Sequence, residues 1–268
     1  MNVFQGIVLG IVQGLTEFLP ISSSGHLVVF QKLFGIKEGA LTFNVAVHFA
    51  TVIAVIWIFR EDILQMIKKP FSKLTLLVVV GTIPTAAIGL LFKDLFDEIF
   101  QSGKTLGIEF ILTGLILWLA ESIRGKNKGV DSTTYIDASV IGVAQGIAIL
   151  PAISRSGLTL AGALLMGLNR EFALKFSFLM SIPPILGAAL LDLKDIVEPG
   201  STALAGIGAW PLIAGILAAG VSGYAAIRFM LKIFSKVSLK GFSYYVFALG
   251  ILIILEQLIS GKIFPSLL

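Results

Sequence analysis

The sequence LGIVQGLTEFLPISSSGHL, residues 9–27, begins like a membrane helix but carries polar side chains from Gln13 onward. An ionisable side chain at the centre of a bilayer costs about 2.5–3.5 kcal/mol on insertion scales, so Glu17 predicts a functional site. Gln13 lies four residues before Glu17 on the same helix face, so both side chains can point into one cavity. Pro20 is expected to end this helix, because its ring removes a donor and clashes with the preceding turn.

A second helix is expected to begin directly after the break, at Ser22-Ser23-Ser24-Gly25. Free backbone N–H groups and hydroxyls at a helix N-terminus attract anions, and phosphate in particular. His26 adds an imidazole one turn into this helix. A carboxylate, an imidazole and a serine-rich helix start at one break therefore predict a phosphate-handling site in the membrane.

The composition is that of an integral membrane protein. Of the 268 residues, 56% are hydrophobic and 13% are charged, with a mean hydropathy of +0.97, whereas about a quarter of the residues of soluble domains are charged. Hydrophobic runs of roughly 16–24 residues favour helical spans over the ten-residue strands of a barrel. The net charge of +4 comes from basic residues scattered through short loops, so no nucleic-acid partner is expected. The absence of cysteine excludes disulfides and a thiolate nucleophile.

We expect an all-α membrane protein with six transmembrane helices and two re-entrant helix–loop–helix hairpins, in a single membrane domain over residues 1–268. The hairpins are predicted over 4–34 and 138–168, and the spans over about 41–59, 74–92, 106–120, 172–191, 211–230 and 244–259. A polar linker, 121–137, joins two halves at about 1–123 and 135–268.

The two halves repeat. Residues 9–25 align without gaps on IGVAQGIAILPAISRSG, residues 141–157, with seven identities in 17 positions, so an internal duplication is predicted. Three spans in each half place the repeats in inverted orientation. Inverted repeats with broken helices are a transporter-like architecture, with the site at the repeat interface.

Loop charges predict the orientation. Basic loops at 60–73, 121–137 and 228–241 alternate with acidic loops at 93–105 and 192–208. Lys/Arg-rich loops stay in the cytoplasm, so both termini are expected outside, and the first hairpin enters from the outer face.

The second hairpin adds a cation at the position of Ser23, namely Arg155. Its planar guanidinium is always charged and binds phosphate oxygens in pairs. Because Arg155 is as costly in lipid as Glu17, we expect the two hairpin tips to meet in one pocket. The residues predicted to bind the substrate there are Gln13, Ser22, Ser24, Ser154, Ser156 and Thr159.

The motifs QGLTE (13–17), PISSSGH (20–26) and PAISRSGLT (151–159) resemble the signatures of the bacitracin-resistance family of undecaprenyl-diphosphate phosphatases. The family patterns are E/Q-xxx-E and PGxSRSxxT, and the resemblance spans essentially the whole chain. Ala152 replaces the family's glycine, but a small residue survives, so the turn should survive too. Gln13 stands where many members have Glu, which puts in doubt any mechanism that needs two carboxylates there.

The resemblance implies a substrate, a place and a cofactor. The substrate is the C55 polyprenyl diphosphate left by cell-wall polymer synthesis, which is hydrolysed to the monophosphate carrier and inorganic phosphate, giving bacitracin resistance. The site opens to the outer face of the bacterial plasma membrane, and Mg²⁺ or Ca²⁺ assists. Beyond the lipid substrate and the surrounding membrane lipid, glycine-rich faces allow a homodimer.

The expected catalytic residues leave alternatives open. Glu17 is interpreted as a metal ligand or general base, and Arg155 as a phosphate clamp or a structural ion pair with Glu17. Ser23 is favoured as nucleophile, with water as the alternative, and His26 as its base or as the nucleophile itself. His48, in the middle of a predicted span, is interpreted as a satisfied core histidine without polar company.

Three other functions fit parts of this pattern. A transporter or flippase of a polyprenyl phosphate would also show inverted repeats with half-helices aimed at an anion, and an enzyme could also carry its product across. A non-catalytic binding protein would not need so many buried polar groups. A nucleophile, a base and a metal ligand exceed what binding requires, which favours the enzyme.

Overall fold

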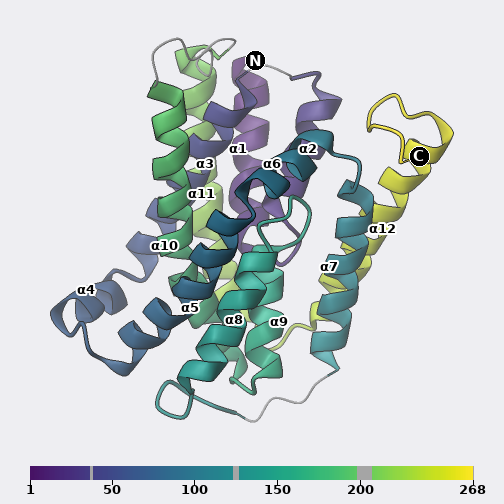
Figure 1. Cartoon of the computed structure of the whole chain (residues 1–268). Helices are drawn as coiled ribbons and strands as arrows, with labels where there is room; N and C mark the ends of the chain where they lie inside the picture. The colour runs from purple at the N-terminus through teal and green to yellow at the C-terminus, as the bar shows by residue number, and fades with distance from the viewer. Residues whose placement is uncertain (37–38, 123–126, 198–206, 268) are drawn as a thin grey trace.

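The computed structural model describes residues 1–36, 39–122, 127–197 and 207–267, which are helical apart from turns and one β-bridge between Lys128 and Leu168 (Figure 1). The helices are α1 (Val3–Phe18), α2 (Ser23–Leu33), α3 (Ala40–Ile58), α4 (Arg60–Lys68), α5 (Lys73–Leu91), α6 (Lys93–Ser102), α7 (Leu106–Glu121), α8 (Tyr135–Ile147), α9 (Arg155–Leu165), α10 (Arg170–Val197), α11 (Ala209–Ile233) and α12 (Leu239–Ile259).

Five of these described helices are long and apolar enough to cross a membrane: α3, α5, α11, α12 and the Arg170–Leu191 part of α10. The predicted span at 106–120 forms α7, which has only 16 residues. The all-α, multi-pass class is therefore confirmed, while the count of six spans stays a prediction.

Two segments predicted as loops contain short helices, and this part of the prediction is wrong. Within 60–73 lies α4, and within 93–105 lies α6. In α4 the acidic residues Glu61 and Asp62 occupy the first turn and Lys68 the last, so these charges complement the helix dipole. Helices of nine or ten residues depend on their surroundings, so the sequence alone gave little signal. Residues 123–126 of the predicted linker and 198–206 of the acidic loop lie outside the described residues.

Glycines bring α1 and α11 into close contact, as the small-residue spacing predicts. A Cβ at Gly6 would overlap the carbonyl of Pro211, and one at Gly10 would overlap the carbonyl of Gly215. At Gly14 it would lie 2.5 Å from the Ala219 carbonyl oxygen. Because these faces are buried within one chain, they offer nothing to a second copy, and the homodimer stays a prediction.

The second hairpin packs in a similar way. Helix α8 runs along α5, and a Cβ at Gly142 would overlap the carbonyl of Gly81. Helix α7 pairs with α12, where Gly107 and Gly250 each face the other's carbonyl oxygen, and α3 contacts α10. In Figure 1 the α1–α2 hairpin enters the bundle from the end that carries both termini, and α8–α9 enters from the opposite end.

Substituting Gly142 with leucine tests this packing. We expect Gly142→Leu to destabilise the protein by about 1–3 kcal/mol or more, because the obstacle is backbone rather than a movable side chain. Gly241→Ala is the matched control, since nothing lies within 4 Å of a Cβ at that helical position. Thermal unfolding in detergent, followed by size-exclusion chromatography, measures both. Equal melting temperatures for the two variants would contradict the close α5–α8 contact.

Candidate active site

The two helix breaks meet and are hydrogen-bonded to each other. The hydroxyls of Ser22 and Ser24 donate to the carbonyl of Pro151, at 2.9 Å from Ser22. In the other direction, Ser156 donates to the carbonyl of Leu19 at 2.9 Å. In the repeat alignment Ser24 corresponds to Ser156 and Leu19 to Pro151, so equivalent bonds join the loops in both directions. The structure thus brings the two hairpin tips together, as expected.

A serine caps the helix that follows each break. Ser22 accepts from the N–H of Gly25 at 3.3 Å, and Ser154 accepts from the N–H of Gly157 at 3.1 Å.

The two breaks also pack closely at Gly25. A Cβ at Gly25 would lie 2.6 Å from the Phe110 ring and 3.0 Å from the Ala152 Cβ. Ala152, the departure from the family pattern, is fully buried in this contact, so the position needs a small side chain.

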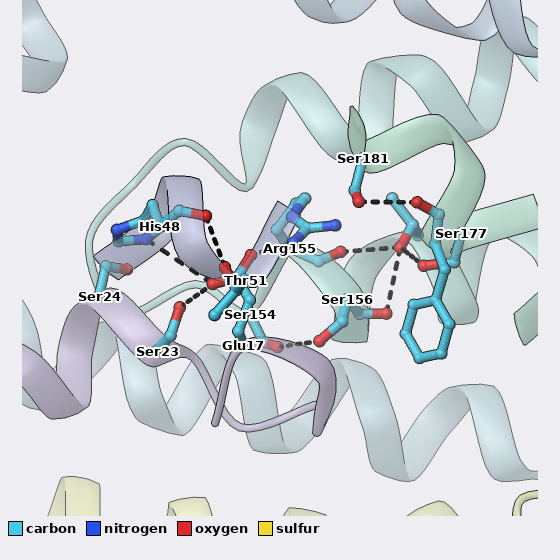
Figure 2. Close-up of polar contacts among 12 residues, drawn as sticks. Glu17, Ser23, Ser24, His48, Thr51, Ser154, Arg155, Ser156, Ser177 and Ser181 are labelled. Atoms are coloured by element: carbon cyan, nitrogen blue, oxygen red, sulfur yellow. Dashed lines mark hydrogen bonds and ion pairs between the residues drawn. The ribbon is translucent and has the colours of Figure 1, made fainter. Parts of the chain in front are cut away.

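Glu17 is the centre of the polar cluster (Figure 2). Its Oε2 accepts from the Ser23 hydroxyl at 2.6 Å and from Gln13 Nε2 at 3.1 Å. Its Oε1 pairs with Nη2 of Arg155. The carboxylate of the first hairpin is therefore joined to the guanidinium of the second, and Glu17 is only 5% exposed.

This arrangement has the parts needed to activate a hydroxyl and to bind an anion. The Ser23 proton faces a carboxylate oxygen that can take it, which is how an adjacent base activates a hydroxyl nucleophile. Within the described residues, Nη1 of Arg155 and Oε1 of Gln13 are buried without a hydrogen-bond partner. A phosphate oxygen would satisfy the first atom and a cation the second, since unpaired buried polar groups are costly.

The structure does not bring His26 to Ser23. Its Nδ1 donates to the carbonyl of Ser22 at 2.6 Å, and its Nε2 accepts from the Tyr245 hydroxyl at 2.8 Å. The ring packs edge-on against Phe110, with centroids 5.3 Å apart. In this arrangement His26 links α2 to α12 through Tyr245. The Ser23 hydroxyl donates its hydrogen bond to Glu17 and not to His26. A catalytic role for His26 stays a prediction.

His48 lies at the site, so the expectation that it has no polar company is wrong. Its Nε2 is 3.7 Å from Oε2 of Glu17, and its Nδ1 donates to the carbonyl of Asn44 at 2.8 Å. The signal available in the sequence was the rule that an ionisable side chain within a span is functional by default.

The hydroxyls of the second hairpin support the loop rather than face Glu17. Thr159 donates to the carbonyl of Arg155 at 2.9 Å and lies 2.5 Å from the Ser177 hydroxyl. The hydroxyls of Ser154 and Ser156 are occupied by the helix cap and by Leu19. These predicted substrate-binding residues position the start of α9, which carries Arg155.

Two residues of α7 that the sequence reasoning missed hold the second loop. Glu109, which is buried, accepts from the N–H of Ala152 at 2.8 Å and from Thr105 at 2.7 Å. Thr113 donates to the carbonyl of Ala152 at 3.0 Å and accepts from the N–H of Ser154 at 3.1 Å. An acidic residue and a threonine four positions apart in an apolar run were the signal that could have found them.

Fold and site together define a multi-pass helical membrane protein with a buried polar site at the meeting point of two broken helices. The chain belongs to the family described as bacitracin resistance protein BacA, whose family model matches residues 6–252. The resemblance expected from the motifs is thus confirmed.

Several curated relatives match almost end to end. An undecaprenyl-diphosphatase of Carboxydothermus hydrogenoformans is 60% identical over 257 residues, covering 96% of this chain and 98% of the relative. An undecaprenyl-diphosphatase of Halothermothrix orenii is 47% identical, covering 95% and 98%. Undecaprenyl-diphosphatase 4 of Bacillus thuringiensis is 46% identical, covering 96% and 98%.

Proposed function

We propose that this chain is an integral-membrane phosphatase that hydrolyses undecaprenyl diphosphate to undecaprenyl phosphate and inorganic phosphate. The observation that carries the proposal is the Ser23 hydroxyl, held 2.6 Å from the Glu17 carboxylate and beside Arg155 of the other hairpin. Membership of the family and the names of the near-full-length relatives support it. The reaction recycles the lipid carrier for cell-wall polymers and gives bacitracin resistance.

The residues of the site suggest a reaction in two displacements. Arg155 binds the terminal phosphate through its free Nη1, and Ser23 Oγ forms a bond to the terminal phosphorus while its proton moves to Glu17. The bond from phosphorus to the bridging oxygen breaks, and undecaprenyl phosphate leaves with the electron pair and takes the proton from Glu17.

Water then attacks the phosphoserine. Glu17 accepts a proton from this water and returns it to Ser23 Oγ as the phosphorus–oxygen bond breaks, releasing inorganic phosphate. In the alternative, Glu17 activates a water that attacks the diphosphate directly, and Ser23 only holds the phosphate.

The donor set fits a magnesium or calcium ion bound together with the substrate. Among the described residues, no three His, Asp or Glu side chains gather into a metal cluster. Mg²⁺, however, is usually held by one or two carboxylates together with substrate phosphates and waters. Glu17, the unpaired Oε1 of Gln13 and Ser23 Oγ are the oxygen ligands that would hold it. When bound, the ion would neutralise charge on the diphosphate.

Inverted repeats, six spans and an outward-facing site complete the proposal, in a bacterial plasma membrane. The packing of α1 on α11 matches that of α8 on α5, which supports a duplicated frame. Both termini lie at one end of the bundle (Figure 1), and the basic segments 60–73 and 228–241 lie at the other. Basic loops face the cytoplasm, so the first hairpin enters from the outer face.

Phosphate release tests the function directly. Detergent-purified protein is expected to release phosphate from undecaprenyl diphosphate without a membrane potential, and EDTA is expected to suppress the release. Glu17→Ala is expected to lower the rate roughly 10²–10⁴-fold, as for loss of a general base. A well-folded wild type that releases no phosphate would contradict the proposal, and flux of polyprenyl phosphate in vesicles would then be measured.

A further inference from the structure

His48 reaches Glu17 from outside both hairpins. Its helix, α3, is held in place by Gln31 of α2, which donates to Asn44 Oδ1 at 2.7 Å. The Asn44 carbonyl can only accept, so Nδ1 of His48 donates to it and the opposite edge of the ring is fixed toward Glu17. Figure 2 shows His48 and Ser23 approaching the same carboxylate.

The contact falls on the catalytically important oxygen. Oε2 of Glu17 accepts a hydrogen bond from the Ser23 hydroxyl at 2.6 Å, while Oε1 accepts one from Arg155. His48 lies 3.7 Å from Oε2, and its side chain is 27% exposed against 4% for Glu17. The imidazole therefore lies beside Oε2 and is the less buried of the two side chains.

We propose that His48 is a positioning residue that keeps Glu17 Oε2 directed at Ser23 and keeps water away from that oxygen. The inference rests on the proposed phosphatase function. Without the imidazole, water would compete with Ser23 for Oε2, and the carboxylate could turn both oxygens toward Arg155, forming the bidentate pair that guanidinium prefers. Fewer molecules would then hold the hydroxyl ready for attack, while the contacts that bind the diphosphate would persist.

The test separates kcat from KM in purified protein with undecaprenyl diphosphate as substrate. His48→Ala is expected to lower kcat about 10- to 100-fold, the scale of a small misplacement of reacting groups, and to leave KM nearly unchanged. His48→Gln, which places an amide beside Oε2, is expected to restore most of the loss. Thr51→Val is the control, because the Thr51 hydroxyl donates to the backbone carbonyl of His48, at 2.7 Å, and not to Glu17.

A double-mutant cycle with Gln13→Ala sharpens the test, because Gln13 also contacts Oε2, at 3.1 Å. Two residues that act through one oxygen should show non-additive effects on kcat. Unchanged kcat in His48→Ala would overturn the inference, and so would additive effects of the His48 and Gln13 substitutions on kcat. The inference would also be overturned if His48→Gln did not restore kcat and the loss of activity accompanied a lowered melting temperature. These results presuppose an active wild type. A wild type without phosphatase activity would instead overturn the proposed function.

Discussion

Replacing Ser23 with alanine is expected to lower phosphate release from undecaprenyl diphosphate by roughly 10³-fold or more, as when the nucleophile of a coupled nucleophile–base unit is removed. The hydroxyl lies 2.6 Å from Glu17 Oε2, so the variant loses the proposed nucleophile while the Glu17–Arg155 pair remains. Alanine is the best helix former, so the start of α2 should persist. Ser181→Ala is the matched control, because that buried hydroxyl donates only within α10, to Phe178.

A trapped intermediate distinguishes attack by Ser23 from direct attack by water. With substrate labelled with ³²P in the terminal phosphate, acid quenching of the wild type is expected to leave label on Ser23 and none on the Ser23→Ala protein. Turnover near normal in Ser23→Ala would refute the nucleophile. If Ser23→Ala loses turnover but the wild-type protein carries no label after the quench, direct attack by water would be favoured, with Ser23 as a hydroxyl that holds the phosphate.

The all-helical class and the places where helices break were predictable because the bilayer leaves the backbone few choices. A helix must satisfy its own hydrogen bonds in lipid, so apolar length and the interruptions near Pro20 and Pro151 predict where helices begin and end. The observed breaks follow Phe18 and Ile147, close to these prolines. Helices α4 and α6 were not predicted because they lie in charged segments and are only nine and ten residues long, too short for a clear helical pattern.

That Glu17 and Arg155 would meet in one pocket was predictable, because both lie in polar segments that are costly to place in lipid. The contacts of His48, Glu109 and Tyr245 were not, because each depends on how one helix is rotated against another. His26 shows the same limit within a single helix. The i, i+3 spacing from Ser23 favours a shared face, yet the ring bonds the Ser22 carbonyl and Tyr245.

The two halves of the proposed duplication carry different side chains at corresponding positions. Position 149, which corresponds to Glu17, is isoleucine, and position 158, which corresponds to His26, is leucine. Gln145, the counterpart of Gln13, donates to Thr85 and to the Met180 carbonyl, each at 3.2 Å. One half thus supplies the carboxylate and the other supplies the cation. This asymmetry favours a single composite site over two equivalent ones.

Arg155→Lys is expected to separate a phosphate clamp from a structural ion pair. Lysine keeps the positive charge beside Glu17, so the melting temperature should stay near that of the wild type. It lacks the planar fork, however, so it cannot hold Glu17 and a phosphate oxygen at the same time through two terminal nitrogens. Loss of one preorganised donor to developing charge costs about 10²–10³-fold in rate, and we expect a loss of kcat/KM of that size.

Arg155→Ala supplies the contrast. It leaves the buried Glu17 carboxylate without its partner, which typically costs 3–5 kcal/mol, so it should lower both the melting temperature and activity. Kinetics of phosphate release and thermal unfolding in detergent, measured on the same preparations, separate the two roles. If Arg155 serves only as an ion pair, the lysine protein will be stable and nearly as active as the wild type. If the Arg155→Lys protein is stable but slow, the guanidinium must act on the substrate. Lysine retains the positive charge and the contact with Glu17, and what the variant lacks is the unpaired Nη1 of Arg155.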